Sequence, residues 1–211
     1  MSRTPMQTLK LLVAIFLMSL LSACISLIDE PPAITTYALQ ADAEPLNSWP
    51  SVPWSLTIVR PNSNNFLDNN RISVRPEPNI LQVYQGANWL DSLPDLVQTN
   101  LVESFENSNK IKSVSRQNSG VPAEVALQLD IRKFESTYVT GQKIPTVQIQ
   151  IHAKILEYPS NRVIASKTFN SETKPSSKEI PDVVIAFEQG LKTMNQEIVG
   201  WTLSNGRAKS K

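Results

Sequence analysis

Cys24 carries the only thiol in the chain and His152 the only imidazole, which limits the side-chain chemistry available to the protein. A zinc site built from Cys and His, or an H-E-x-x-H motif, needs more such ligands than one of each. None of the six glycines has the spacing of a phosphate-binding loop, and no G-x-S-x-G motif accompanies His152. We therefore expect no metal site, no catalytic residue and no enzyme activity, and we interpret His152 as a surface or cross-strand residue.

The chemistry that remains is modification of Cys24 after export. Residues 1–10 contain Arg3 and Lys10 without an acidic residue, and residues 11–21 are almost wholly apolar, as in a secretory signal. As a helix this run is roughly 16 Å long, too short to span a bilayer. Leu21-Ser22-Ala23-Cys24 then matches the bacterial lipobox. In such signals the thiol receives diacylglycerol, and the chain is cut between Ala23 and Cys24.

Acylation of Cys24 predicts a lipid-anchored protein on the periplasmic side of an envelope membrane. Stable anchoring takes about two acyl chains, and the expected diacylglycerol and N-acyl chain on Cys24 supply them. We expect no other cofactor. Ile25 follows where an Asp would favour retention in the inner membrane, so we predict the outer membrane. An ordinary signal peptide with an incidental cysteine is the alternative.

The remaining chain has the size of one domain with a real core. Two of the 20 basic residues and none of the 19 acidic residues lie in the leader, so the mature chain is nearly neutral, which argues against nucleic acid as a partner. We divide the sequence into a signal peptide (1–23), an acylated tether (24–33), a domain (34–205) and a basic tail (206–211).

Hydrophobic periodicity predicts an α+β fold. Apolar residues recur at helical spacing over residues 92–107 and 180–203. Alternating patterns predict strands at 34–39, 54–60, 71–75, 80–84, 125–132, 147–155 and 162–169, with a hairpin across 76–79. One-sided alternation is typical of antiparallel sheets. We expect a two-layer sandwich, a mainly antiparallel sheet covered on one face by two helices.

Several segments together resemble the ABC-type transport auxiliary lipoprotein family, to which the paraquat-inducible C lipoprotein is similar. The resemblance covers roughly residues 34–203, behind the lipobox. Its residues are Tyr37-Ala-Leu39, Leu67-Asp68, Arg71-Ile-Ser-Val-Arg75, Asn79, Tyr84-Gln-Gly-Ala-Asn-Trp89, Leu93-Pro94, Ala123 to Phe134, Ala186-Phe187 and Val199-Gly-Trp201-Thr-Leu203. The family pattern has Arg where this chain has Asn88.

This resemblance implies an outer-membrane accessory subunit of an ABC or paraquat-inducible-type system that moves phospholipid between membranes. The implied partner is a periplasm-spanning mammalian-cell-entry (MCE) domain protein, and a homo-oligomer is a further possibility. Candidate partner contacts are Arg71, Arg75 and Trp89; each also has a structural interpretation, as sheet-edge charges and as a helix staple. The alternatives are a structural or assembly lipoprotein without a transport role and a periplasmic lipid-binding carrier.

The anchor assignment makes a direct prediction. Cells given labelled palmitate should incorporate the label into the wild-type protein, and Cys24→Ala should lose the label because it removes the acylated thiol. Gel fluorography of immunoprecipitated protein is the measurement. Equal labelling of the two proteins would contradict the assignment.

Overall fold

A computed structural model describes residue 6, residues 9–10 and residues 33–207, and the chain divides into two units, 1–33 and 34–211. Ala23, Cys24 and most of the predicted tether lie outside the described residues, so the signal, the cleavage site and the acylation stay predictions. Among the residues that the structure does describe, none of the helices combines the length and the apolarity that crossing a bilayer requires.

The second unit contains nine strands in one sheet and two helices within the described residues. Both predicted helices are present, and all seven predicted strands are present with shifted ends. The elements are β1 (Thr35–Tyr37), β2 (Val52–Ile58), β3 (Asn62–Ser63), β4 (Arg71–Glu77), β5 (Ile80–Trp89), α2 (Leu93–Ser108), β6 (Ile111–Arg116), β7 (Val125–Thr137), β8 (Thr146–Glu157), β9 (Arg162–Thr173) and α3 (Ile180–Asn205).

The sheet is organised around the long strand β7. On one edge β7 pairs with β8 along its whole length, and β8 pairs in turn with β9; both pairings are antiparallel. On the other edge β2, β3 and β4 follow one another, each parallel to β7. β6 pairs with the far edge of β2. β5 pairs with the far edge of β4, and β1 pairs in turn with β5.

The expectation of a mainly antiparallel sheet needs correction, because the sheet is mixed. The β4–β5 hairpin and the β7–β8–β9 meander are antiparallel as predicted, but β1–β5, β2–β6 and the three contacts of β7 with β2, β3 and β4 are parallel. β6 runs parallel to β2 because α2 carries the chain back before β6 begins. β6 and β3 have no counterpart in the predicted strands.

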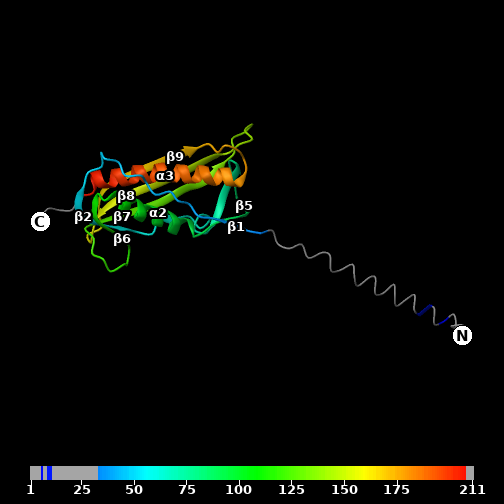
Figure 1. Ribbon diagram of the computed structural model, residues 1–211, viewed down its shortest axis with the longest axis horizontal. Coiled ribbons are helices and arrows are strands. Elements are labelled where there is room, and N and C mark those ends of the chain that lie inside the picture. Colours follow the sequence, from blue (N-terminus) through cyan, green and yellow to red (C-terminus); the bar gives the residue numbers. More distant parts are fainter. Residues whose placement is uncertain (1–5, 7–8, 11–32, 208–211) are drawn as a thin grey trace. The chain divides into compact units, whose positions relative to one another are not determined.

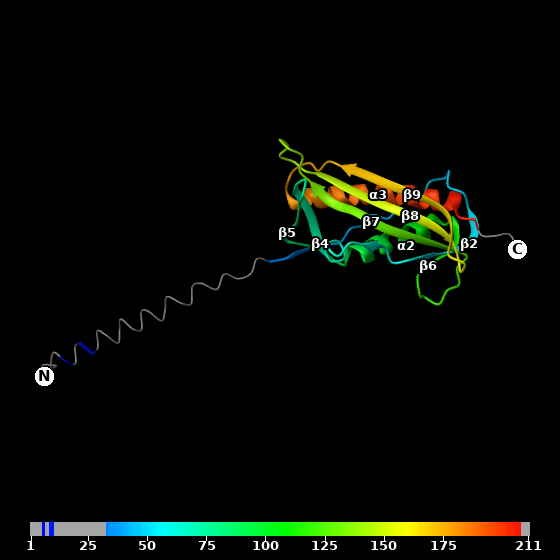
Figure 2. The same cartoon turned by 180° about the vertical axis from the view of Figure 1, so that it is seen from behind.

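Both helices lie on the same side of the sheet, which Figure 1 shows from the helix side and Figure 2 from the sheet side. Three aromatic rings pack between the sheet and the helix layer. Phe134 of β7 stacks on Phe187 of α3 with ring centroids 4.9 Å apart, and Trp89 meets Phe134 edge-on at 6.1 Å and Phe187 edge-on at 5.4 Å. All three side chains are buried. Each such aromatic pair contributes about 0.5–1.5 kcal/mol beyond the apolar area it buries.

An extended segment, Leu39–Glu44, fills the groove between the two helices and was absent from the predicted architecture. We call it the strap. Its odd-numbered residues Leu39, Ala41 and Ala43 are buried. The Ala41 N–H donates to Asn100 Oδ1 at 2.6 Å, and the Ala43 N–H donates to Ser104 Oγ at 2.8 Å. From α3, the Asn195 side-chain amide donates to the Ala41 carbonyl at 2.8 Å. Polar side chains of the two helices thus make the backbone hydrogen bonds to the strap that a neighbouring strand would make in a sheet.

Beyond the strap, Trp49 packs against α3 at Gly200. A Cβ atom at position 200 would lie 2.6 Å from Trp49 Nε1, which is closer than any van der Waals contact permits. The glycine in the Val199-Gly-Trp201 segment is therefore required for packing. Together the strap and Trp49 hold the segment between β1 and β2 against the helix layer.

The strap should contribute measurably to stability. Asn100→Ala removes the acceptor of the buried Ala41 N–H and a donor to the Leu39 carbonyl, so we expect the free energy of unfolding to fall by about 1–3 kcal/mol. Urea denaturation followed by circular dichroism measures the change.

Asn107→Ala is the matched control, because Asn107 lies on the same helix and bonds the exposed side of the strap at Asp42. A solvent-exposed hydrogen bond of this kind should cost less than about 0.5 kcal/mol on removal. Equal losses in the two variants would contradict the assigned role of the strap.

Candidate functional site

A groove forms at one end of the domain because the chain must cross the open face of the sheet there. β6 and β7 are both parallel to β2, so residues 117–124 return over β2 to begin β7. The Gln117 N–H donates to the Ile58 carbonyl at 3.1 Å, and the Glu124 N–H donates to the Ser55 carbonyl at 3.1 Å. The crossing loop is thus attached to β2 at both of its ends.

The β8–β9 turn at residues 158–161 forms the opposite wall, and the Tyr158 N–H donates to the Glu124 carbonyl at 2.9 Å. Between loop and turn lies a cavity of about 610 Å³, which we call the distal groove. This volume is within the range of ligand and peptide sites, about 300–1,000 Å³. The groove is lined by Thr57, Val59, Gln117, Asn118, Gly120, Val121, Pro122, Ala123, Ala126, Gln128, Leu156, Tyr158 and Asn161.

The chemistry of the distal groove is uncharged. Among the described residues, no Asp, Glu, Lys, Arg or His side chain lines it. The two carboxylates next to lining residues in the sequence are engaged elsewhere, since Glu124 accepts the Ser55 N–H at 2.7 Å and Glu157 pairs with Arg162 at 3.1 Å. Val121 and Tyr158 expose about half of their surface at the rim, 50% and 45%. The groove therefore suits an uncharged segment that combines apolar groups with amides or hydroxyls.

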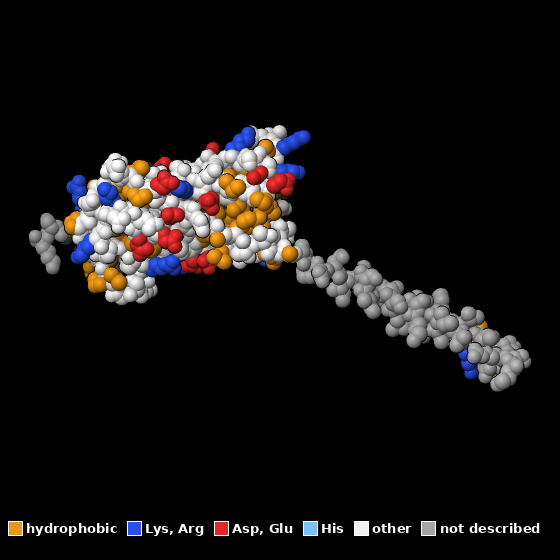
Figure 3. Space-filling model, viewed as in Figure 1, with side chains coloured by type: hydrophobic (Ala, Val, Ile, Leu, Met, Phe, Trp, Pro, Cys, Tyr) orange, Lys and Arg blue, Asp and Glu red, His pale blue; other side chains and the backbone are white. Residues whose placement is uncertain are grey.

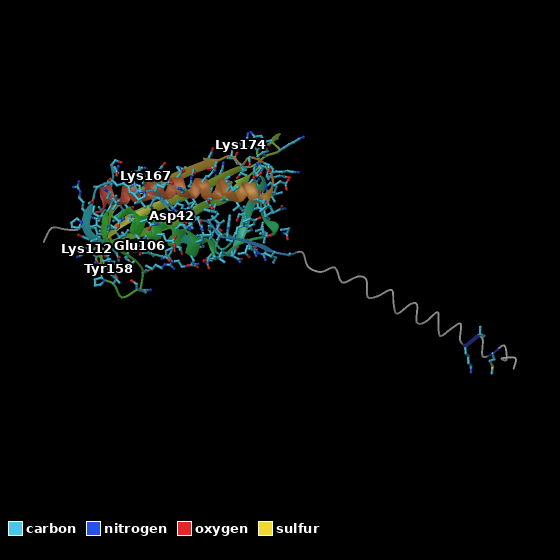
Figure 4. The ribbon with its side chains drawn as sticks, viewed as in Figure 1. Asp42, Glu106, Lys112, Tyr158, Lys167 and Lys174 are labelled. Carbon is cyan, nitrogen blue, oxygen red and sulfur yellow. The ribbon has the colours of Figure 1, made fainter. Side chains whose placement is uncertain are left out.

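The distal groove lies far from the start of the domain. Figure 4 places Tyr158 at one end of the long axis and Lys174, which follows β9, toward the other. β1, β4 and β5 are at the same end as Lys174 (Figures 1 and 2). The described domain begins at that end, and the groove is at the opposite end.

The three residues predicted as partner contacts are not brought together. Trp89 is 1% exposed and belongs to the core, so its ring presents no surface to a partner in this structure. Arg75 forms a bidentate pair with the buried carboxylate of Glu135, at 2.7 and 3.0 Å, which raises the pKa of the guanidinium. β4 lies between β5 and β7 at Arg75, so this arginine does not flank a sheet edge as proposed.

Arg71 is the exposed member of the three. It lines a shallow hollow of about 650 Å³ between β5 and the loop at residues 64–70. Its strand neighbour in the register is Asn88, the position at which the family pattern has Arg. A second arginine there would face Arg71 directly across the strands, and like charges in that position repel.

A cluster around Arg60 explains the Leu67-Asp68 segment structurally. The Arg60 guanidinium binds Asp68 at 2.8 Å and Asp95 at 2.7 Å, and it also donates to Ser92 Oγ at 3.0 Å. Ser92, the residue before α2, donates to Asp95 rather than capping the helix backbone. The hydrogen bond from Arg60 lowers the pKa of Asp95. The cluster holds the loop at 64–70 to the start of α2.

The open face of the sheet carries ladders of polar side chains, as its alternating pattern predicts. His152 lies between Asp130 and Thr168 in the register, and its Nδ1 is 2.9 Å from Thr168 Oγ1. Gln150 donates to Asn170 at 2.7 Å on the same face. The expectation that His152 is a cross-strand residue is confirmed. Among the described residues, no group of three or more His, Cys, Asp or Glu side chains could hold a metal ion.

The described domain combines one mixed sheet, two helices on one of its faces and an uncharged groove on the other. The chain belongs to the ABC-type transport auxiliary lipoprotein component family, whose model matches residues 37–199. Membership places it with lipoproteins that assist ABC-type transporters, and therefore with the cell envelope. The resemblance read from the sequence is confirmed.

Individual relatives add detail. A 115-residue segment is 30% identical to an uncharacterized protein of Bradyrhizobium diazoefficiens; it covers 54% of this chain and only 30% of that protein. The crystal structure of protein XCC0632 from Xanthomonas campestris, of the family DUF330, has 40% identity and a TM-score of 0.78, and covers 82% of this chain and 96% of that one. A further uncharacterized protein, 14% identical with a TM-score of 0.60, covers 79% of this chain and 97% of that one and shares the fold.

The ion pairs of Asp95 predict a dependence of stability on pH. Because Asp95 has a lower pKa in the folded state than the ordinary value of 3.8, its stabilisation is fully present above that value. It is lost as the pH falls through the folded pKa. Asp95→Asn should therefore reduce the free energy of unfolding at neutral pH by about 0.5–1 kcal/mol, a small value because the pair is half exposed.

Urea titrations at several pH values test this, and the difference from wild type should shrink below the ordinary carboxyl pKa. Asp91→Asn changes an exposed carboxylate in the turn before α2 and serves as the control. A difference between Asp95→Asn and wild type that persists unchanged into strong acid would rule out the ion-pair explanation.

Proposed function

We propose that this chain is an outer-membrane lipoprotein accessory subunit of an ABC or MCE-type system for phospholipid transport. Acylated at Cys24, it would act without catalysis, as a docking element for a periplasm-spanning MCE-domain partner. The observation that supports the proposal most is the family match over residues 37–199, directly behind a lipobox. Energy for transport would come from another subunit, since neither common phosphate-binding loop is present in this sequence.

The distal groove is the docking site that we assign to the partner. It is at the end of the domain away from the point where the tether enters (Figures 1 and 4). An anchored domain can present such a surface to a partner that arrives across the periplasm. The exposed apolar rim at Val121 and Tyr158 and the polar floor at Gln128 fit an uncharged protein segment. Arg71 is a second, separate contact candidate.

A lipid-binding carrier is less consistent with the packing. A carrier would hold an acyl chain between sheet and helices, but in this domain Trp89, Phe134 and Phe187 occupy that space in mutual contact. The distal groove lies on the other face of the sheet, over Thr57 and Ala126. A structural lipoprotein without a transport role remains the alternative that the experiment below distinguishes.

Affinity purification of the full acylated protein from its native envelope tests the proposal. Mass spectrometry should recover an MCE-domain protein with wild type. Val121→Glu places a charge on the apolar rim of the groove, where an uncharged partner segment would have to bury it, and should lower recovery by about tenfold.

Ile185→Glu is the matched control, because Ile185 is 53% exposed on α3 near the opposite end and Val121 is 50% exposed. It should leave recovery unchanged. Recovery of outer-membrane assembly proteins alone with wild type would refute the transport role, and equal recovery with both variants would refute the groove assignment.

A further inference from the structure

The end of the domain that carries β1 and the β4–β5 hairpin exposes large apolar side chains that no packing role explains. Ile34 is 64% exposed, Leu90 60%, Val139 50% and Ile80 40%. We call these four residues the tether-end patch. Figure 3 shows hydrophobic side chains gathered at this end of the domain, near β1 and the start of α3.

Backbone pairing places the four residues as two pairs, one at each end of β5. Ile34 directly precedes β1, which pairs with the end of β5, and the Leu90 N–H donates to the Tyr37 carbonyl at 2.8 Å. Ile80 begins β5 at the hairpin tip. Val139 follows β7, where the Tyr138 N–H donates to the Arg75 carbonyl of β4 at 2.9 Å.

A hollow of about 570 Å³ lies between the hairpin tip and the β7–β8 loop, which strengthens the apolar character of this end. Pro76 and Pro78 form one side and Tyr138 and Val139 the other. Two prolines and an exposed valine offer few backbone donors to water. Exposed apolar side chains that gather at one end of a domain mark a contact with a partner or a membrane.

We propose that the tether-end patch rests on the lipid surface into which Cys24 is acylated. The inference depends on the proposed function for the anchor itself. Only nine residues lie between Cys24 and Ile34, and the ten steps from one Cα to the next span at most about 33–36 Å when fully extended. Ile34 is part of the patch, so the patch can never move further from the bilayer than this tether permits. Because the tether keeps the patch close to the bilayer, contact between the patch and the lipid is an intramolecular event with a high effective concentration.

Charge indicates which force drives the contact. Lys143, Lys174 and Lys178 are exposed at this end, and Glu77, Glu172 and Glu179 are exposed there as well. The opposite charges balance, so attraction to anionic headgroups contributes little. Burial of the apolar side chains at the boundary between headgroups and acyl chains carries the contact. Binding of the patch should then depend weakly on salt.

The contact gives the domain a fixed orientation. With the tether-end patch on the bilayer, the long axis points into the periplasm and the distal groove is held away from the lipid (Figure 1). A tether alone would leave the domain free to rotate, and the groove would face the membrane part of the time.

Site-specific fluorescence on the full acylated protein tests the inference. Leu90→Cys, Val139→Cys and Val121→Cys each introduce one free thiol, because the native thiol of Cys24 is consumed by lipid. Each variant is labelled with an environment-sensitive fluorophore and reconstituted into vesicles of phosphatidylethanolamine and phosphatidylglycerol containing spin-labelled lipid. Val139 and Val121 are equally exposed at opposite ends, 50% each, so they form a matched pair.

We expect blue-shifted emission and about twofold or greater quenching by spin-labelled lipid at positions 90 and 139, because side chains at the boundary lie within reach of the spin label. Position 121 should show neither effect. Equal quenching at positions 139 and 121 would overturn the inference. Flotation of the same vesicles reports the anchor separately, so a protein that floats with unquenched patch probes is anchored without the contact. Shielding that appears only at high protein density would assign the patch to a second copy and overturn the inference as well.

Discussion

β7 is the strand on which the rest of the domain depends, because neighbouring strands pair with both of its edges. β8 covers one edge in a continuous antiparallel ladder. β2, β3 and β4 share the other edge, and the chain leaves the sheet between β3 and β4. β7 also supplies Leu127, Leu129 and Phe134 to the core. The helices pack against a sheet whose centre is this one strand.

The hollows of the surface follow from the interruptions beside β7. The distal groove forms where the chain crosses β2 to begin β7. The hollow at Arg71 forms beside the loop at residues 64–70, which separates β3 from β4. The hollow at the tether end forms where β7 ends next to the β4–β5 hairpin. Three short strands that share one edge of β7 therefore leave hollows between them. A single long strand in their place would have paired with this edge without interruption.

The sequence predicted the helices and the meander well because each has a strong local period. Leu93, Val97, Leu101 and Phe105 recur every four residues, and all four are buried. β6 and β3 were missed because a short strand with half-buried or exposed side chains has no clear alternation. Leu39, Ala41 and Ala43 do alternate with polar residues, so the strap had a signal. Its pairing with helix side chains, however, requires Asn100 and Asn195 to converge from segments far apart in the sequence.

The candidate site was less predictable than the fold, for a related reason. Residues singled out by the family resemblance proved to be structural where their contacts are local or in the core, as with Trp89 and Phe187. The distal groove instead depends on a crossover, and its lining comes from β2, β7, β8 and two connecting segments. Gly120, Pro122 and Asn161 mark turns in the sequence but give no indication of a shared cavity. Parallel pairing of β2 with β6 and β7 is the fact from which the groove follows.

The uncharged groove is physically compatible with the proposed lipid anchor. A nearly neutral protein with an uncharged site has little electrostatic steering, and association between such surfaces proceeds at about 10⁵–10⁶ M⁻¹s⁻¹ rather than at the steered limit. Specificity must then come from shape and from hydrogen bonds made at short range. Confinement to one bilayer surface would compensate for the slow association, because the domain and its partner would then meet within a thin layer instead of the whole volume of the compartment. In the proposed function, a domain confined to a membrane surface therefore does not need a charged docking surface. The strap joins β1 to the helix layer and so links the end at which the domain begins to the rest of the fold.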